Sequence, residues 1–418
     1  MDSDDARRDL KTVLENLKEF DIELVETETI SNDIEATRVG NKLKSENADL
    51  LVLFVLHGAT CDLHILVAEI SELPTVIWSL PVRYSFTTSA SAFGALREKK
   101  HRVKLVHGSP DDRSIASKVM LIARVAFTIN RLREARIGTA GEVMRPMIPS
   151  FYDKNIVRDR LGPNIVHIST ADLRSALEEV TDEQLQQELR RVTSSFRIAV
   201  DEKVLKKGLK FHLGLKAISK QCQLDAISLE CHTELAGEFN INPCLGYIEA
   251  DYIIGCEGEV VNTVALLMLW HLTGKYGFLT DVFSVDSRGV LTTAHCAGPS
   301  YLAQSLKQVT LCKQTPPQHP SPKIKEYYAV CRPQIPPGQA TILRLFGRQM
   351  DNLHLATGAI ISCDVENPAH MWVKVKLNGD PAEFVANVCG NHYIVVPGDV
   401  REELKAICEW LRIRVVET

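Results

Sequence analysis

Short apolar runs alternate with segments whose apolar residues recur at helical spacing, and this alternation limits the fold more than any other feature. The runs predicted as strands are LLVLFVL (50–56), TVIWSL (75–80) and VKLVH (103–107), with IELVE (22–26) as a further candidate. Helices are predicted over 33–45, 61–71, 89–99 and 111–133. Continuous apolar strands are typical of a parallel sheet that helices cover on both faces. Residues 1–140 are therefore predicted to form an N-terminal α/β domain.

The middle of the chain repeats this pattern after a Pro-containing loop that follows RIGTAG (136–141). Its predicted strands are NIVHIS (164–169), DAISLE (225–230) and YIIGCE (252–257). Its predicted helices are 171–191, 198–220 and 260–272, and Thr181 with Gln184 fits a capping box. Residues 141–300 are therefore predicted to form a second α/β domain with a parallel sheet.

The pattern of apolar and polar residues changes after QTPPQHPSPK (314–323). Short alternating runs follow at 326–332, 340–346, 359–365, 370–377 and 392–398, and one helix is expected over 399–411. Such runs are typical of antiparallel strands. The predicted fold class is thus two parallel-sheet α/β units followed by a C-terminal antiparallel, barrel-like β domain, residues 301–418.

Charge and hydropathy exclude several classes of protein. The chain has 48 basic and 53 acidic side chains and a formal charge of −5, which argues against binding to nucleic acid or to anionic lipid. The apolar runs 50–56 and 264–270 are far shorter than the ~20 residues of a membrane span. The charged start, MDSDDARRDL, has no apolar signal region, so a cytoplasmic location is expected. Eleven cysteines without a C-x-x-C pair indicate neither a zinc knuckle nor a disulfide framework.

Acidic residues gather just after two predicted parallel strands. Glu230, Glu234 and Glu238 follow one strand, and Glu257 and Glu259 follow the other. Ligand sites in open α/β sheets lie at the carboxyl ends of strands. Carboxylates that converge there are costly unless a cation or another partner neutralises them, which suggests a divalent metal. The alternative is that these glutamates are solvated loop charges.

Four segments resemble a known family. They are ECHTELAGEF (230–239), GCEGEVVNTVALLMLWHLTGKYGFLTDVFSVD (255–286), TAHCAGPS (293–300) and GNHYIVVPGDVREELKAICEWLRI (390–413). In this order they resemble the L-fucose isomerase-like proteins, relatives of the L-fucose and L-arabinose isomerases, and a weaker similarity extends over nearly the whole chain. The resemblance implies a metal-dependent aldose–ketose isomerase that uses Mn²⁺, with Mg²⁺ or another divalent ion as the alternative.

The same resemblance implies a set of site residues. Glu234 would be a metal ligand and an acid/base, Glu259 the second ligand and base, and His392 the third ligand. The family usually has Asp where this chain has Glu259, and the extra methylene moves the carboxylate by about a bond length, enough to alter the substrate or the rate. Without the family pattern, His392 would be interpreted as an ordinary histidine at a strand end.

Three further residues are candidate substrate contacts. Glu257 would lie beside the metal ligands or touch the substrate, and His295 matches a histidine of the shorter relatives for which we expect a role in sugar binding. Trp372 is a candidate for stacking on a sugar, with a core or interface position as the alternative.

The implied chemistry explains why carboxylates and a cation occur together. Converting an aldose into a ketose moves a proton between adjacent carbons through an enediol, so it needs acid/base groups and stabilisation of developing negative charge. The family also implies a small sugar substrate and a homo-oligomer, a trimer or hexamer in which a neighbour's N-terminal domain closes the pocket. Two alternatives remain open: a catalytically silent sugar-binding protein, and a metal-dependent lyase or hydrolase.

Overall fold

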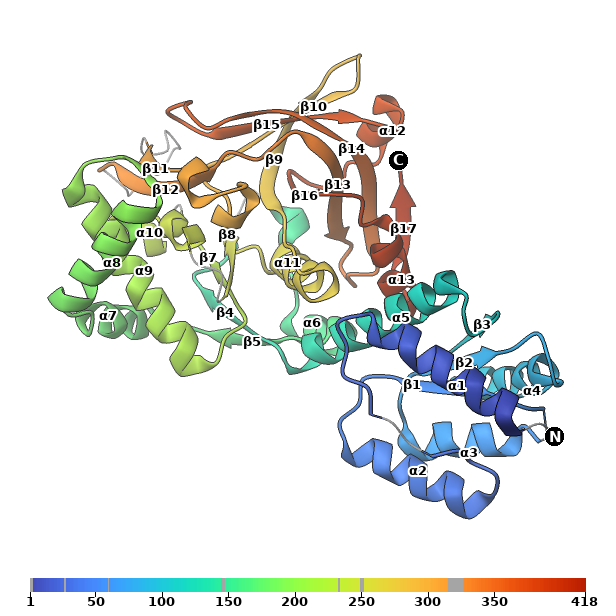
Figure 1. Ribbon diagram of the computed structural model, residues 1–418. Coiled ribbons are helices and arrows are strands. Elements are labelled where there is room, and N and C mark those ends of the chain that lie inside the picture. The colour runs from blue at the N-terminus through green and yellow to red at the C-terminus, as the bar shows by residue number, and fades with distance from the viewer. Residues whose placement is uncertain are drawn as a thin grey trace. The chain divides into compact units, whose positions relative to one another are not determined.

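The computed structural model describes residues 3–25, 28–58, 60–143, 147–231, 234–248, 252–314 and 326–418, with the backbone alone for 234–236 (Figure 1). The chain forms two compact units, Met1–Asn130 and Arg131–Thr418. Among the described residues, no helix combines the length and hydrophobicity that crossing a membrane requires.

The first unit is built on a parallel sheet with the strand order β1-β2-β3. Its strands are β1 (Leu51–Val55), β2 (Thr75–Ser79) and β3 (Val103–His107). Its helices are α1 (Ser3–Lys18), α2 (Asp33–Ser45), α3 (Asp62–Ser71), α4 (Ser85–Glu98) and α5 (Arg113–Glu134), which continues into the second unit.

Helices cover both faces of this sheet, as the continuous apolar runs predict. Ile77 packs in a cluster with side chains of α2, α3 and α4, whereas its neighbours Val76 and Trp78 pack with α1 and α5. The prediction of a strand at 22–26 is wrong for the described residues 22–25, which are irregular. Ile22 and Leu24 pack against the α1 and α5 cluster instead, so their apolar character reflects burial rather than pairing.

The second unit begins with a four-stranded parallel sheet of order β5-β4-β7-β8. The strands are β4 (Arg136–Ala140), β5 (Asn164–His167), β7 (Ala226–Leu229) and β8 (Ile253–Cys256). The helices are α6 (Lys154–Leu161), α7 (Thr170–Glu178), α8 (Asp182–Ser195), α9 (Glu202–Cys222), α10 (Glu234–Phe239) and α11 (Val260–Thr273). The capping box of Thr181 and Gln184 is confirmed at the start of α8.

One predicted helix begins later than expected. Residues 197–199 form strand β6 (Arg197–Ala199), and α9 starts only after it. β6 pairs in parallel with β11 (Val309–Gln314), which pairs with β12 (Tyr328–Pro333). A partner distant in the sequence thus overrides the local helical periodicity.

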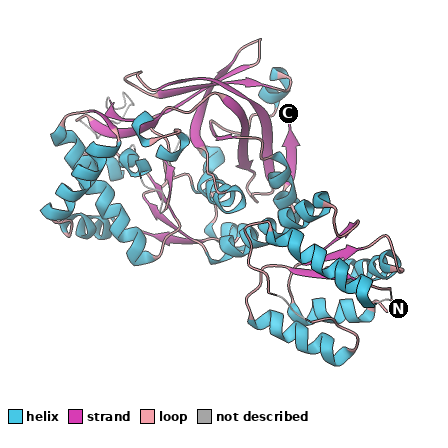
Figure 2. Cartoon of the chain, viewed as in Figure 1, coloured by secondary structure: helices cyan, strands magenta, loops and turns pink. Residues whose placement is uncertain are grey.

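The rest of the second unit is a closed antiparallel barrel (Figure 2). Six strands follow the order β13-β16-β9-β10-β15-β14, and pairing of β13 with β14 closes the ring. The strands are β9 (Phe278–Val285), β10 (Val290–His295), β13 (Gly338–Phe346), β14 (Asn352–Asp364), β15 (Met371–Leu377) and β16 (His392–Pro397). Helices α12 (Pro381–Ala386) and α13 (Arg401–Leu411) follow β15 and β16, and β17 (Arg414–Glu417) adds to β14 in parallel. Two barrel strands therefore precede residue 300.

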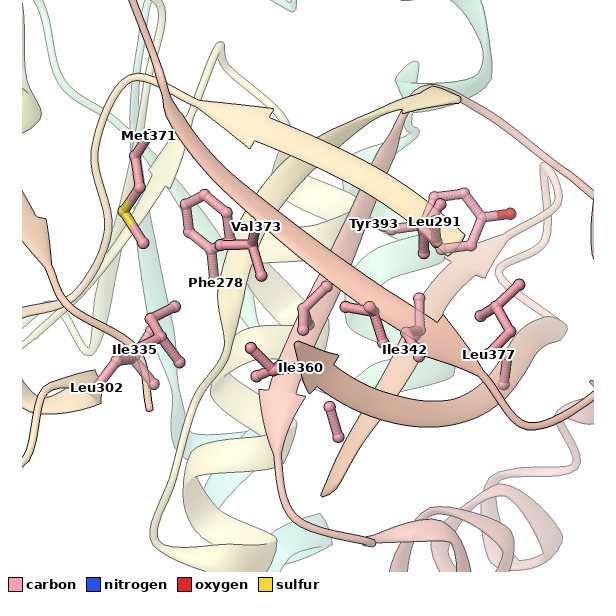
Figure 3. Close-up of a cluster of buried hydrophobic side chains, with 14 of the residues drawn as sticks. Phe278, Leu291, Leu302, Ile335, Ile342, Ile360, Met371, Val373, Leu377 and Tyr393 are labelled. Atoms are coloured by element: carbon pink, nitrogen blue, oxygen red, sulfur yellow. The ribbon is translucent and has the colours of Figure 1, made fainter. Parts of the chain in front are cut away.

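Alternating side chains fill the barrel interior (Figure 3). Met371, Val373 and Val375 of β15 are buried in the barrel core, and the residues between them, Trp372 and Lys374, belong to the other face. This alternation is what an antiparallel sheet with one buried face requires. The barrel therefore presents a second, outward face on which functional side chains can stand.

Candidate metal centre

Four side chains of the second unit form a group that could hold a metal ion. Glu257 follows β8, Asp281 lies on β9, His295 ends β10 and His392 begins β16. One ligand atom from each side chain lies within 4.8 Å of all the others. The register of the barrel explains part of this convergence, because Asp281 pairs directly with His392. The carboxyl end of a parallel strand thus meets three barrel strands at one point.

The spacing inside the group fits a shared ion better than direct hydrogen bonds. His392 Nε2 lies 3.5 Å from Glu257 Oε2 and 3.5 Å from Asp281 Oδ1, and His295 Nε2 lies 3.6 Å from Glu257 Oε1. These distances exceed those of good hydrogen bonds. Two ligand atoms that are each about 2.1 Å from one ion lie roughly 3 to 4 Å apart.

Unpartnered nitrogens support the same conclusion. Within the described part of the chain, Nε2 of His392 and both ring nitrogens of His295 are buried without a hydrogen-bond partner. A buried polar atom without a partner is costly, and a cation satisfies imidazole nitrogens of this kind. The donor set of two carboxylates and two imidazoles therefore fits a divalent metal.

Glu259 stands beside this group rather than within it. Its fully buried Oε2 accepts a hydrogen bond from Nδ1 of His392 at 2.5 Å, on the opposite side of the ring from the metal group. Its Oε1 accepts a hydrogen bond from Ser150 Oγ and lies 3.1 Å from Nη1 of Arg344. A carboxylate on the second nitrogen of a histidine fixes the orientation and tautomer of the ring.

Arg344 ties this network together. Its guanidinium donates to the backbone carbonyl of His392 and, at 3.1 Å, to Ser150 Oγ. A Cβ at Gly390 would lie 2.5 Å from Cζ of Arg344, so a side chain at this position would displace the guanidinium. Glycine at 390 thus leaves room for the buried cation that pairs with Glu259.

The charges of the pair shift both of its pKa values. Burial alone would raise the pKa of Glu259, but His392 and Arg344 outweigh it and lower the value to about 2. Burial alone would lower the pKa of His392, but Glu257 and Glu259 outweigh it and raise the value to about 9. The pair is therefore an ion pair at neutral pH when no metal competes for His392.

The backbone explains why Glu257 and Glu259 face different sides of His392. Glu257 has φ +59° and Gly258 has φ +70°, so the chain leaves β8 through two left-handed residues. A Cβ at Gly258 would lie 2.7 Å from the carbonyl oxygen of Glu142, which makes a side chain there unfavourable. A left-handed conformation is unfavourable for a residue with a Cβ, so the surrounding contacts must hold Glu257 in it.

The structure brings together three of the predicted site residues. Glu257, His295 and His392 share the metal group, which Glu259 adjoins through His392. Glu234 begins α10, but its side chain lies outside the described part, so its predicted role stays a prediction. Trp372 lies on β15.

Asp281 was not predicted as a metal ligand from the sequence. The available signal was a single carboxylate inside the apolar run FLTDVFSV (278–285). A charged residue within a strand of this kind is unfavourable unless it is paired or exposed.

Comparison with known proteins identifies distant relatives. No family model matches the chain. Relatives named sulfoquinovose isomerase include one from Alkalicoccus urumqiensis, 21% identical over 373 residues, 83% of this chain and 81% of the relative. One from Priestia megaterium (strain ATCC 12872 / QMB1551) is 22% identical over 386 residues, 87% of this chain and 84% of the relative. One from Clostridium sp. (strain MSTE9) is 23% identical over 371 residues, which are 81% of this chain and 79% of the relative. The similarity thus extends over most of each chain.

Proposed function

We propose that the protein is a metal-dependent aldose–ketose isomerase that acts on a small sugar. The observation that carries the proposal is the group of Glu257, Asp281, His295 and His392 at the carboxyl end of β8. Relatives named sulfoquinovose isomerase along most of the chain support it, as do the four segments that resemble L-fucose isomerase-like proteins.

The proposed ligand set is the observed group, and the proposed ion is Mn²⁺ or Mg²⁺. Hard carboxylate oxygens together with imidazoles suit such ions better than thiolate-seeking metals. This set takes Glu257 and Asp281 where the resemblance implied Glu234 and Glu259. When bound, the ion would stabilise negative charge that develops on the oxygens of the substrate.

Proton transfer needs a carboxylate that substrate can reach. The side chain of Asp281 is 29% exposed, that of Glu257 is 11% exposed, and that of Glu259 is fully buried. Asn391 Nδ2 donates to Asp281 Oδ1 at 2.7 Å and orients this carboxylate. We therefore assign proton transfer between the adjacent carbons of an enediol to Asp281, with Glu234 as its proposed counterpart, and give Glu259 the role of positioning His392.

The names of the relatives suggest a substrate to test first. Sulfoquinovose is a six-carbon aldose with a sulfonate at the end remote from its carbonyl, and we propose a sugar of this size. Membership of the L-fucose isomerase-like family, a homo-oligomeric state and a cytoplasmic location are parts of the same proposal.

The test incubates the purified protein with Mn²⁺ and sulfoquinovose in D₂O and follows the products by NMR. An enediol route predicts a ketose that carries deuterium from the solvent at the carbon that receives the proton. Binding without conversion would favour the silent sugar-binding protein, and fragments would favour a lyase. Full metal content in both Glu257→Gln and His392→Ala variants would contradict the proposed ligand set.

A further inference from the structure

Three aromatic rings gather on the barrel at β9 and β15. The ring centroids of Phe283 and Trp372 are 4.7 Å apart, and that of His370 lies 6.2 Å from each of them. Phe283 is 51% exposed, and His370 and Trp372 are partly exposed. Large aromatic side chains gain most from burial, so a cluster that stays open to solvent calls for an explanation.

The strand register places this cluster next to the metal group. Ala294 of β10 pairs with Asp281 on one side and with Trp372 on the other. Residues that pair across neighbouring strands project from the same face of a sheet. Asp281 and Trp372 therefore stand on one face, two strand spacings or about 10 Å apart, with only the small side chain of Ala294 between them.

A second contact links the cluster to the other side of the group. The side chain of His370 interacts with the thiol of Cys296, the residue that follows His295. The three rings are thus connected to the metal group through both β9 and β10.

We propose that Phe283, His370 and Trp372 form an aromatic platform that holds the end of the sugar remote from its carbonyl. This proposal rests on the proposed function and adds the residues that select substrate length. The C–H face of a sugar stacks favourably on aromatic rings. A six-carbon sugar whose carbonyl end lies at Asp281 extends along the barrel face toward Trp372, the direction in which the platform lies.

The test compares Trp372→Ala and Phe283→Ala with Val385→Ala, a substitution of an exposed apolar residue on α12, beyond the opposite end of β15. The probe is sulfoquinovose, measured by calorimetric binding to the Mn²⁺-loaded protein and by steady-state kinetics. We expect Kd and KM to rise about tenfold for each platform variant, the equivalent of losing one aromatic contact, with kcat within about twofold. Val385→Ala should leave all three unchanged, and Trp372→Phe should restore most of the affinity.

The outcomes separate the two proposals. Turnover with unchanged KM in both platform variants overturns the platform alone. Sulfoquinovose binding that is lost in Trp372→Ala, in a protein that converts no sugar, supports the platform and overturns the isomerase. Absence of binding to the unaltered protein overturns the platform. A changed molecular mass of the variants by light scattering, with unchanged affinity, assigns the rings to contact between copies and also overturns it.

Metal content and thermal unfolding give the structural control. Because the platform residues are not metal ligands, both variants should retain as much Mn²⁺ as the unaltered protein. A loss of metal in parallel with the loss of affinity would mean that the rings support the barrel rather than the sugar, and would contradict the proposal.

Discussion

The two parallel sheets of this protein end in very different ways. At the carboxyl end of β2, the first unit presents exposed apolar side chains, among them Tyr84 at 81% exposure. The rings of Phe86 and His107 make an edge-to-face contact there, with their centroids 4.8 Å apart. At the carboxyl end of β8, the second unit presents Glu257 and Glu259, both buried and both directed at His392.

The difference shows what converts a sheet edge into a candidate site. Burying a carboxylate is expensive unless charged and hydrogen-bonding partners come with it. In the second unit, barrel strands β9, β10, β13 and β16 bring those partners, which are Asp281, His295, Arg344 and His392. In the first unit, apolar side chains and a histidine occupy the equivalent place without any buried carboxylate group in the described residues.

The largest expected effect is a difference in metal binding between variants of the two histidines, one near the carboxyl end of each sheet. His392→Ala should lower Mn²⁺ affinity and isomerase activity by more than about 100-fold, because loss of a ligand exceeds the 10–100-fold typical of losing a residue behind one. His107→Ala, at the end of β3, should leave the metal content unchanged. Metal analysis after dialysis and titration with Mn²⁺ measures both, and equal metal loss in the two variants would remove the distinction between the edges.

The next effect comes from breaking the buried ion pair behind His392. Glu259→Gln should lower the free energy of unfolding by about 3–5 kcal/mol, because Arg344 then keeps a buried charge without its partner. The matched change Glu238→Gln removes a carboxylate that pairs with Arg174 at the surface and should cost at most about 1 kcal/mol. Chemical denaturation measures the unfolding free energy of both variants. Similar decreases would mean that the buried ion pair of Glu259 stabilises the protein no more than a surface ion pair.

A pH dependence of stability follows from the same pair in metal-free protein. The pKa of His392 is raised from 6.5 to about 9, so its contribution is complete below pH 6.5 and is lost as the pH rises through 9. The pKa of Glu259 is lowered from 4.5 to about 2, so its contribution is present above pH 4.5 and is lost as the pH falls toward 2. The unfolding free energy should fall by about 3 kcal/mol between pH 6 and pH 10. His392→Ala should abolish most of this decrease, and an unchanged slope in that variant would assign it to other groups.

The smallest expected effect tests backbone strain after β2, at the carboxyl end of the first sheet. Arg83 and Tyr84 both have positive φ, +55° and +54°. Tyr84→Gly relieves the steric cost of a left-handed residue but adds backbone entropy to the unfolded chain, so stability should change by at most about 1 kcal/mol, in the stabilising direction. Ser91→Gly, within helix α4, should instead destabilise by about 1 kcal/mol. Thermal unfolding distinguishes the two signs, and destabilisation by both would show that Tyr84 makes favourable contacts.

The elements of the fold were largely predictable because their signals are local. The run LLVLFVL (50–56) and the alternating run HMWVKVKL (370–377) each predict a strand from local pattern alone. The strand β6 was not predictable, because only its pairing with β11 holds residues 197–199 extended. Closure of the barrel by β13 and β14, with β9 between β16 and β10, likewise depends on pairings that no local pattern carries.

The location of the candidate site could be predicted from the sequence, but the full set of side chains that meet there could not. The carboxylates at the end of β8 were visible in the sequence, yet their spacing alone does not tell which of Glu257 and Glu259 joins the candidate metal group. Two successive left-handed residues decide that, and the left-handed state of Glu257 has no sequence signature. Asp281 joins the group only through its register with His392, a pairing across more than a hundred residues.

The order of the donors along the chain has a consequence for how the protein is made. Glu257 emerges from the ribosome long before His392, which belongs to a strand that inserts between β13 and β9. Until β16 takes that place, a nascent chain would offer the proposed metal only part of its donor set, so the ion would not help the early elements to fold. If the proposed ion binds, it would therefore bind only after β16 has been synthesised and has joined the barrel.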